Sequence, residues 1–73
     1  MSNREAALKR VGELQDSIYV LEGDEGFYAR SELNEVIGGF GADELDAIED
    51  AMPECWRQAG FVWVDGRWEL KEV

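Results

Sequence analysis

The sequence predicts an α+β fold in which three helices pack against a C-terminal β-hairpin. Three observations predict it. Residues 42–60 repeat apolar side chains at the spacing of three and four that is typical of a helix. Residues 61–70 alternate around Asp65 and Gly66, as a tight hairpin does. A chain of 73 residues with 45% hydrophobic content can build one core, so we expect residues 1–73 to form a single acidic domain.

The N-terminal part of the chain predicts a helix followed by a short strand. Ser2 and Glu5 fit a capping box, in which each side chain satisfies a backbone donor of the other at a helix start. The apolar positions that follow recur with helical spacing, so we expect this helix to run over residues 2–16. Residues 18–21 are β-branched and aromatic, which favours a strand over a continued helix.

An acidic turn is predicted at residues 22–26, where three carboxylates accompany two glycines. A calcium loop is the sharper hypothesis, but the segment lacks the alternating ligand register and the closing bidentate Glu of such a loop. A solvated turn is therefore the better interpretation. Residues 27–29 should then form a short extended piece.

A second helix is predicted over residues 31–37, with Ser31 as its N-cap and with Gly38 and Gly39 ending it. The segment Gly38-Gly39-Phe40-Gly41 is too little to indicate a phosphate-binding loop, because no Lys and no fingerprint spacing accompany it.

The long helix over residues 42–60 should have two opposed faces. Its apolar side is expected to hold Leu45, Ile48, Met52, Cys55, Trp56 and Ala59. Its other side should present the carboxylates of Asp43, Asp46, Asp50 and Glu54, flanked by Glu44 and Glu49. Pro53 lies inside this pattern and cannot donate a backbone hydrogen bond, so it should either kink the helix or begin a shorter one.

The hairpin turn at Asp65 and Gly66 fixes a register that pairs Trp63 with Trp68. We expect these two indoles to face the core, so that Trp63→Ala costs about 3 to 5 kcal/mol. The predicted core consists of Leu8, Val11, Leu14, Leu33, Ile37, Leu45, Ile48, Met52, Trp56, Trp63 and Trp68.

The net charge is −10, and it is concentrated in the middle of the chain. Residues 13–54 hold thirteen acids and one base, Arg30. Contacts to nucleic acid or to an anionic membrane need Lys and Arg to replace counterions, so we expect neither partner. The balance favours a basic protein partner instead. The alternative interpretation of the acidic charge is that it keeps the protein soluble or adapts it to a cytoplasm of high salt concentration.

The composition argues against a catalytic site and against a metal site. The chain has no histidine, which is the commonest general base and zinc ligand, and its single Cys55 lies beside Glu54 on the apolar face, where the thiolate is disfavoured. We expect no catalytic residue, no metal, no cofactor and no enzymatic activity. The apolar runs are too short to span a bilayer, and no signal peptide is recognisable, which predicts a cytoplasmic protein.

The predicted order of elements resembles that of a winged helix-turn-helix domain, with residues 42–60 in the place of the recognition helix. That family places early residues of the recognition helix against base edges. Here those positions are Asp43, Glu44 and Asp46. Their charge has the wrong sign for DNA binding, so the resemblance implies a layout and not that function.

In size, charge and lack of motifs the chain also resembles small acidic phage-encoded inhibitors that imitate nucleic acid, including anti-CRISPR and anti-restriction proteins. The resemblance implies a non-enzymatic inhibitor, a monomer or weak dimer, that blocks the basic channel of a bacterial defence complex. The partner-binding residues would be Asp43, Glu44, Asp46, Glu49, Asp50 and Glu54, with Glu22, Asp24 and Glu25 as a second cluster. The alternatives are an immunity protein or antitoxin that covers the basic site of a toxin, and a homo-oligomerising accessory domain.

Overall fold

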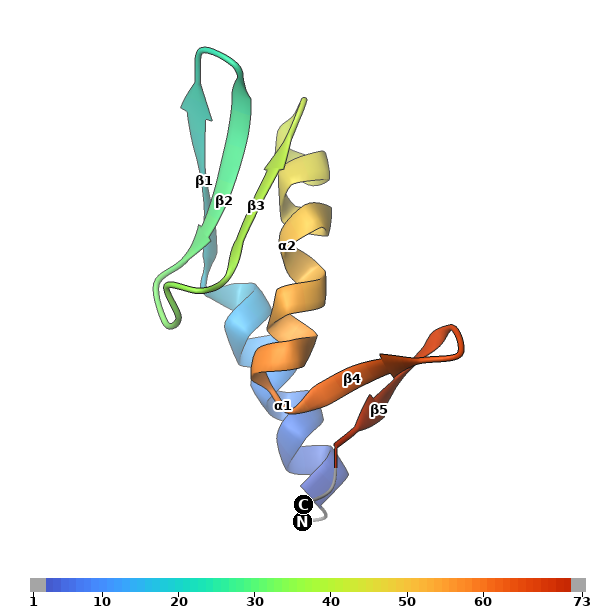
Figure 1. The fold of residues 1–73 in the computed structure, drawn as a ribbon. Coiled ribbons are helices and arrows are strands. Elements are labelled where there is room, and N and C mark those ends of the chain that lie inside the picture. The colour runs from blue at the N-terminus through green and yellow to red at the C-terminus, as the bar shows by residue number, and fades with distance from the viewer. Residues whose placement is uncertain (1–2, 72–73) are drawn as a thin grey trace.

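The computed structural model describes residues 3–71, which form two helices and five strands. Their order is α1 (Asn3–Asp16), β1 (Ile18–Gly23), β2 (Gly26–Ser31), β3 (Gly38–Gly41), α2 (Glu44–Gln58), β4 (Phe61–Val64) and β5 (Arg67–Leu70). Strands β1, β2 and β3 form an antiparallel sheet in that order, and β4 and β5 form a separate hairpin (Figure 1). The molecule is elongated, measuring 43 × 26 × 16 Å with a radius of gyration of 13.0 Å. A compact chain of this length would have a radius of gyration of about 11 Å.

The α+β class agrees with the sequence, but the three-helix layout and the winged-helix order are wrong. No helix forms over residues 31–37. Ser31 Oγ does accept the backbone N–H groups of Leu33 and Asn34, at 3.1 and 3.2 Å, as an N-cap would. The turn then closes on Asn34, which accepts the N–H of Val36 through its side chain and that of Ile37 through its carbonyl. Ser31 therefore caps backbone N–H groups as predicted, but only a single turn follows it, and the chain then enters β3.

Strand β3 replaces the predicted helix end, and its glycines explain why it can pair there. A Cβ on Gly39 would meet the carbonyl oxygen of Ala47 and lie 2.6 Å from the backbone nitrogen of Ala51. A Cβ on Gly41 would lie 2.5 Å from the backbone nitrogen of Ala47. These positions need glycine because the backbones of β3 and α2 are in direct contact.

Helix α2 is rotated relative to the predicted apolar face. The fully buried residues of α2 are Ala47, Ala51 and Cys55, one turn apart. Ile48, Met52 and Trp56 are only half-buried, and 63% of Leu45 is exposed. The helix turns its smallest side chains to the sheet because only these allow the close approach to β3.

The ends of α2 lie within two residues of the prediction, and of the two alternatives predicted at Pro53, a kink or a shorter second helix, the second is wrong. Asp43 is the N-cap, and its side chain accepts the N–H of Asp46 at 2.8 Å. Gly60 follows the C-cap with a φ of 103°, in the region that favours glycine. The helix continues through Pro53, so no second helix begins at that residue.

The first helix, the first strand and the C-terminal hairpin are confirmed. Helix α1 ends at Asp16 as expected, although the capping residue Ser2 lies outside the described residues. Strand β1 begins at Ile18 as expected but continues to Gly23, so the acidic turn predicted over residues 22–26 is reduced to Asp24 and Glu25. The hairpin has the predicted register, with Trp63 opposite Trp68, and Asp65 and Gly66 both have positive φ as the two-residue turn requires.

Two clusters of buried residues form the core. One lies between the sheet, α1 and α2 and contains Leu14, Ala29, Ile37, Ala47, Ala51 and Cys55. The other lies where the hairpin meets the helices, contains Ala7, Val11 and Phe61, and is flanked by Trp56, Trp68 and Leu70. The predicted core is wrong at Leu8, Leu33, Leu45 and Trp63, which are 38%, 54%, 63% and 58% exposed. Trp63 is exposed because the hairpin extends away from the helices (Figure 1).

Candidate interaction surface

The two acidic segments predicted from the sequence lie at the same end of the molecule (Figure 1). The turn between β1 and β2 lies beside the end of β3, since a Cβ on Gly26 would be 2.7 Å from the carbonyl oxygen of Gly41. Helix α2 begins only three residues after Gly41. We call this region the acidic end and define it by Glu22, Asp24, Glu25, Asp43, Glu44 and Asp46. All six residues are exposed.

Three of the nine predicted partner-binding carboxylates already have structural contacts. Asp43 caps α2, as described above, and Asp50 accepts the backbone N–H of Phe40 at 3.0 Å. Glu54 accepts Gln58 Nε2 at 2.9 Å and pairs with Arg57 at 3.0 Å. The hydrogen bond from Gln58, followed by that from Arg57, lowers the pKa of Glu54. Glu54 therefore lies in a partly compensated site, outside the acidic end.

The other six predicted carboxylates lie open to solvent. Within residues 3–71, they form no ion pair and accept no side-chain or backbone hydrogen bond. They are Glu22, Asp24, Glu25, Glu44, Asp46 and Glu49. Glu44 and Asp46 lie in the first turn of α2, where the helix dipole favours negative charge. The other four have no such use in the described residues, and all six charges repel one another.

The basic residues gather away from the acidic end. Six of the seven bases lie on α1, in the last turn of α2, or on and just after β5: Arg4, Lys9, Arg10, Arg57, Arg67 and Lys71. Some are paired locally, such as Arg10 with Glu13 and Arg67 with Glu69, at 3.2 and 2.7 Å. The long axis of the molecule is therefore also an axis of charge, from a strongly negative end to a nearly balanced one.

The sheet presents an aromatic outer face that the sequence analysis missed. Alternate residues point to opposite faces of a strand, and Ala29 and Gly39 face α2. Their neighbours therefore face away from it: Tyr19, Leu21, Tyr28, Arg30 and Phe40, which we call the aromatic face. Tyr19, Leu21 and Phe40 are 43%, 52% and 45% exposed. Two features of the sequence could have indicated this face: side chains alternate between the two faces of a strand over residues 27–31, and Phe40 stands between two glycines.

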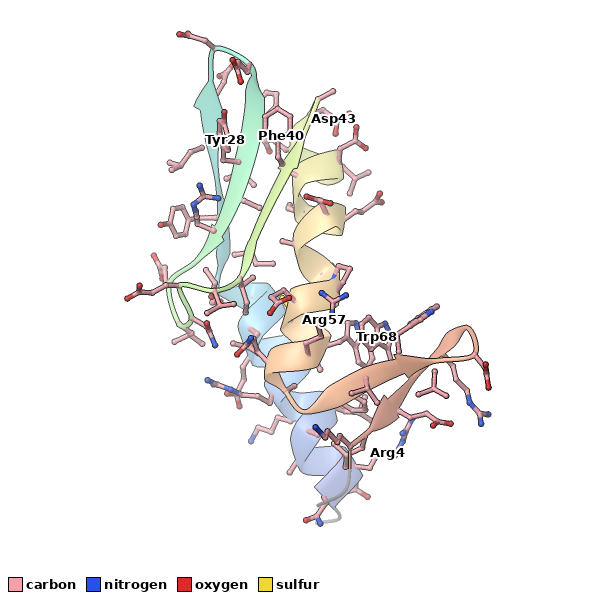
Figure 2. All side chains as sticks on the ribbon, viewed as in Figure 1. Arg4, Tyr28, Phe40, Asp43, Arg57 and Trp68 are labelled. Atoms are coloured by element: carbon pink, nitrogen blue, oxygen red, sulfur yellow. The ribbon has the colours of Figure 1, made fainter. Side chains whose placement is uncertain are left out.

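Within the aromatic face, Tyr28 contacts both Phe40 and Arg30, and Figure 2 shows Tyr28 and Phe40 together on the sheet. The rings of Tyr28 and Phe40 are tilted at 54°, with centroids 5.0 Å apart. The Arg30 guanidinium carbon lies 5.7 Å from the centroid of Tyr28, and Arg30 Nη1 donates to the carbonyl of Ala29 at 3.1 Å. The one base of residues 13–54 is thus held against an aromatic ring.

The described residues offer no arrangement for metal or thiol chemistry. Burial is the main cause that raises the pKa of the Cys55 thiol, and Cys55 is fully buried. In residues 3–71 no group of three or more His, Cys, Asp or Glu side chains is placed to hold a metal ion. None of the helices in that range combines the length and the apolarity needed to cross a bilayer.

Comparisons with protein-family models, with curated proteins and with solved structures find no match for this chain. The functional argument therefore rests on the acidic end and the aromatic face.

Proposed function

We propose that this protein is a non-enzymatic inhibitor that places its acidic end in the basic, nucleic-acid-binding channel of a bacterial defence complex, of the anti-CRISPR or anti-restriction type. It acts in the cytoplasm of the host cell. The observation that carries the proposal is the convergence of two acidic segments, distant in sequence, at one end of an elongated molecule. Six exposed carboxylates that form no ion pair or hydrogen bond within residues 3–71 lie there and on the next turn of α2, where they can pair with Lys and Arg side chains.

The imitation is one of charge density. Successive carboxylates on α2 lie three or four residues apart, which is about 4.5 to 6 Å along a helix axis. Phosphates of a duplex advance by about 3.4 Å per strand. The spacing of the two therefore differs, but both present closely spaced negative charge over a surface that a basic channel can cover. Such pairing accelerates association and is screened by salt over roughly 8 to 10 Å.

Affinity capture from bacterial lysate tests this function. The first variant removes one helix cluster without touching a structural contact: Glu44→Gln, Asp46→Asn and Glu49→Gln. The control removes three charges elsewhere: Glu13→Gln, Asp65→Asn and Glu69→Gln. We expect the wild type and the control to retain nucleic-acid-binding proteins that competing duplex DNA or raised salt releases, and the helix variant to lose them. Equal capture by both variants, or capture insensitive to DNA and salt, would contradict the proposal.

The same experiment separates the alternatives. Recovery of one nuclease or ribosome-targeting toxin, in place of a defence complex, would support an immunity protein or antitoxin, which uses the same acidic end. Recovery of the protein itself alone would support a homo-oligomerising domain. A specific observation favours that last alternative, since Trp63 is 58% exposed on the projecting hairpin.

A further inference from the structure

We infer that the aromatic face is the apolar centre of the interface whose charged rim is the acidic end, and that it binds a protein surface carrying arginine among apolar side chains. This inference rests on the proposed function. The acidic end predicts only that the partner is basic, whereas the aromatic face predicts that its surface also carries apolar side chains.

The aromatic face and the acidic end are contiguous. A Cβ on Gly23 would lie 2.8 Å from Tyr28 Cε2, and a Cβ on Gly26 would lie 2.9 Å from Phe40 Cζ. The two rings therefore lie over the glycines of the β1–β2 turn. Asp24 and Glu25 occupy that turn, between the two glycines. The rings and these carboxylates thus border one another on the surface, and one partner can contact both.

In the described residues, none of the apolar side chains of this face belongs to either core cluster. Ala29 and Gly39, on the opposite face of the same strands, pack directly against α2. Tyr19, Leu21 and Phe40 instead remain about half exposed. A contiguous exposed apolar patch is unusual on a small soluble domain and marks an interaction site. Tyr and Arg are also the residue types that dominate binding energy at the centre of protein interfaces.

The charge around the face decides which partner fits. A second copy of this chain would bring one acidic end and a net charge of −10 against another, which is repulsive in any close arrangement of the two faces. A single-stranded nucleic acid could stack its bases on Tyr28 and Phe40, but only Arg30 is near to contact its phosphates. A partner rich in arginine can bind both surfaces, because guanidinium groups stack on the rings of the aromatic face and pair with the carboxylates of the acidic end.

Two fluorescent peptides of equal positive charge test the inference by anisotropy. In one, arginines alternate with glycine; in the other, they alternate with leucine and tryptophan. We expect the second peptide to bind about tenfold more tightly to the wild type, which is the effect of about one well-packed aromatic contact at an interface. The variant Tyr28→Ser with Phe40→Ser should bind both peptides equally. Trp63→Ser, an exposed aromatic change at the other end of the molecule, should keep the tenfold difference.

Each remaining outcome is decisive. Equal binding of both peptides by the wild type, with loss in the helix variant described above, would overturn the aromatic face and leave the proposed function standing. Binding that the helix variant does not weaken would overturn both. Binding of an oligo-dT of about fifteen nucleotides at low salt, lost in the Tyr28 and Phe40 variant, would assign the face to nucleic acid instead. If that variant does not fold by circular dichroism, Tyr19→Ser with Leu21→Ser provides the same test on the edge strand β1.

Discussion

The two halves of the molecule pack by different means. At the acidic end, the sheet and α2 meet through glycine and alanine, with Gly39 and Gly41 against the helix backbone and Ala47 and Ala51 fully buried. At the other end, α1, α2 and the hairpin meet through aromatic rings. Trp56 stacks on Trp68 with centroids 5.7 Å apart and planes within 4°, and it contacts the edge of Phe61 at 4.9 Å.

This difference explains where the exposed side chains of the acidic half lie. Where β3 contacts α2 through its backbone there is no room for a large residue, so Phe40 of β3 points outward, beside Tyr28 of β2. Larger side chains such as Leu14, Ile37 and Phe27 fill the rest of this interior. In the hairpin half the large residues fill the interior at its base, and Phe61 is only 1% exposed. The acidic half carries an aromatic face because the contact between β3 and α2 is made by glycine and alanine, which leaves Phe40 and the alternate residues of β2 on the outer side of the sheet. The following predictions test each half separately.

Phe61→Ala should produce the largest effect, because it removes a fully buried aromatic ring that packs against Trp56. A fully buried aromatic truncated to alanine costs about 3 to 5 kcal/mol. A domain of this length has a total stability of roughly 4 to 11 kcal/mol, so the variant should be partly or wholly unfolded in urea melts. Trp63→Ala is the matched control. Trp63 is 58% exposed and contacts Trp68 edge-to-face at 5.1 Å, so this change should cost only about 1 kcal/mol. A larger cost for Trp63→Ala than for Phe61→Ala would reverse the assignment of the core.

Gly39→Ala should have the next largest effect, because it separates β3 from α2. The added methyl group meets backbone atoms of Ala47 and Ala51, which cannot move without shifting the helix. Overpacking of this kind costs about 1 to 3 kcal/mol. The same change at Gly12, in the middle of α1, has open space around the new methyl group. Gly12→Ala should therefore stabilise the protein by about 0.5 to 1 kcal/mol, through helix propensity. Thermal melts of the two variants that shift in the same direction would contradict the backbone contact.

The sequence predicted those elements whose signals are local. The turn residues Asp65 and Gly66 determine the hairpin register without any help from the rest of the chain. Likewise, apolar periodicity locates α1 and α2 within a residue or two. The acidic residues of the candidate interaction surface were identified from the sequence, but their meeting at one end of the molecule was not, and their binding to a partner stays a prediction.

Strand β3 and the orientation of α2 could not be predicted in this way, because their causes are long-range. A segment of three glycines in four residues is typical of a loop, and it becomes a strand here only because α2 requires a bare backbone beside it. Hydrophobic patterns are dominated by large residues such as Leu45 and Trp56, whereas the contact with the sheet is made by Ala47 and Ala51. The aromatic face was missed for the same reason, since its exposure follows from that contact.

The smallest predicted effect lies at the joint between the two halves, where Glu54 on α2 binds Gln58 and Arg57. These bonds, that from Gln58 first, lower the pKa of Glu54 from its ordinary value of 4.5. Because the folded state holds the carboxylate at a lower pKa than the unfolded chain, the stabilisation is present above pH 4.5 and is lost as the pH falls through the folded-state pKa. Gln58→Ala removes the first donor, so the pKa of Glu54 should rise toward its ordinary value in a carboxyl carbon NMR titration. Gln15→Ala, an exposed glutamine on α1, should leave the titration unchanged. An identical Glu54 titration in the wild type and Gln58→Ala would mean that Arg57 alone holds the carboxylate.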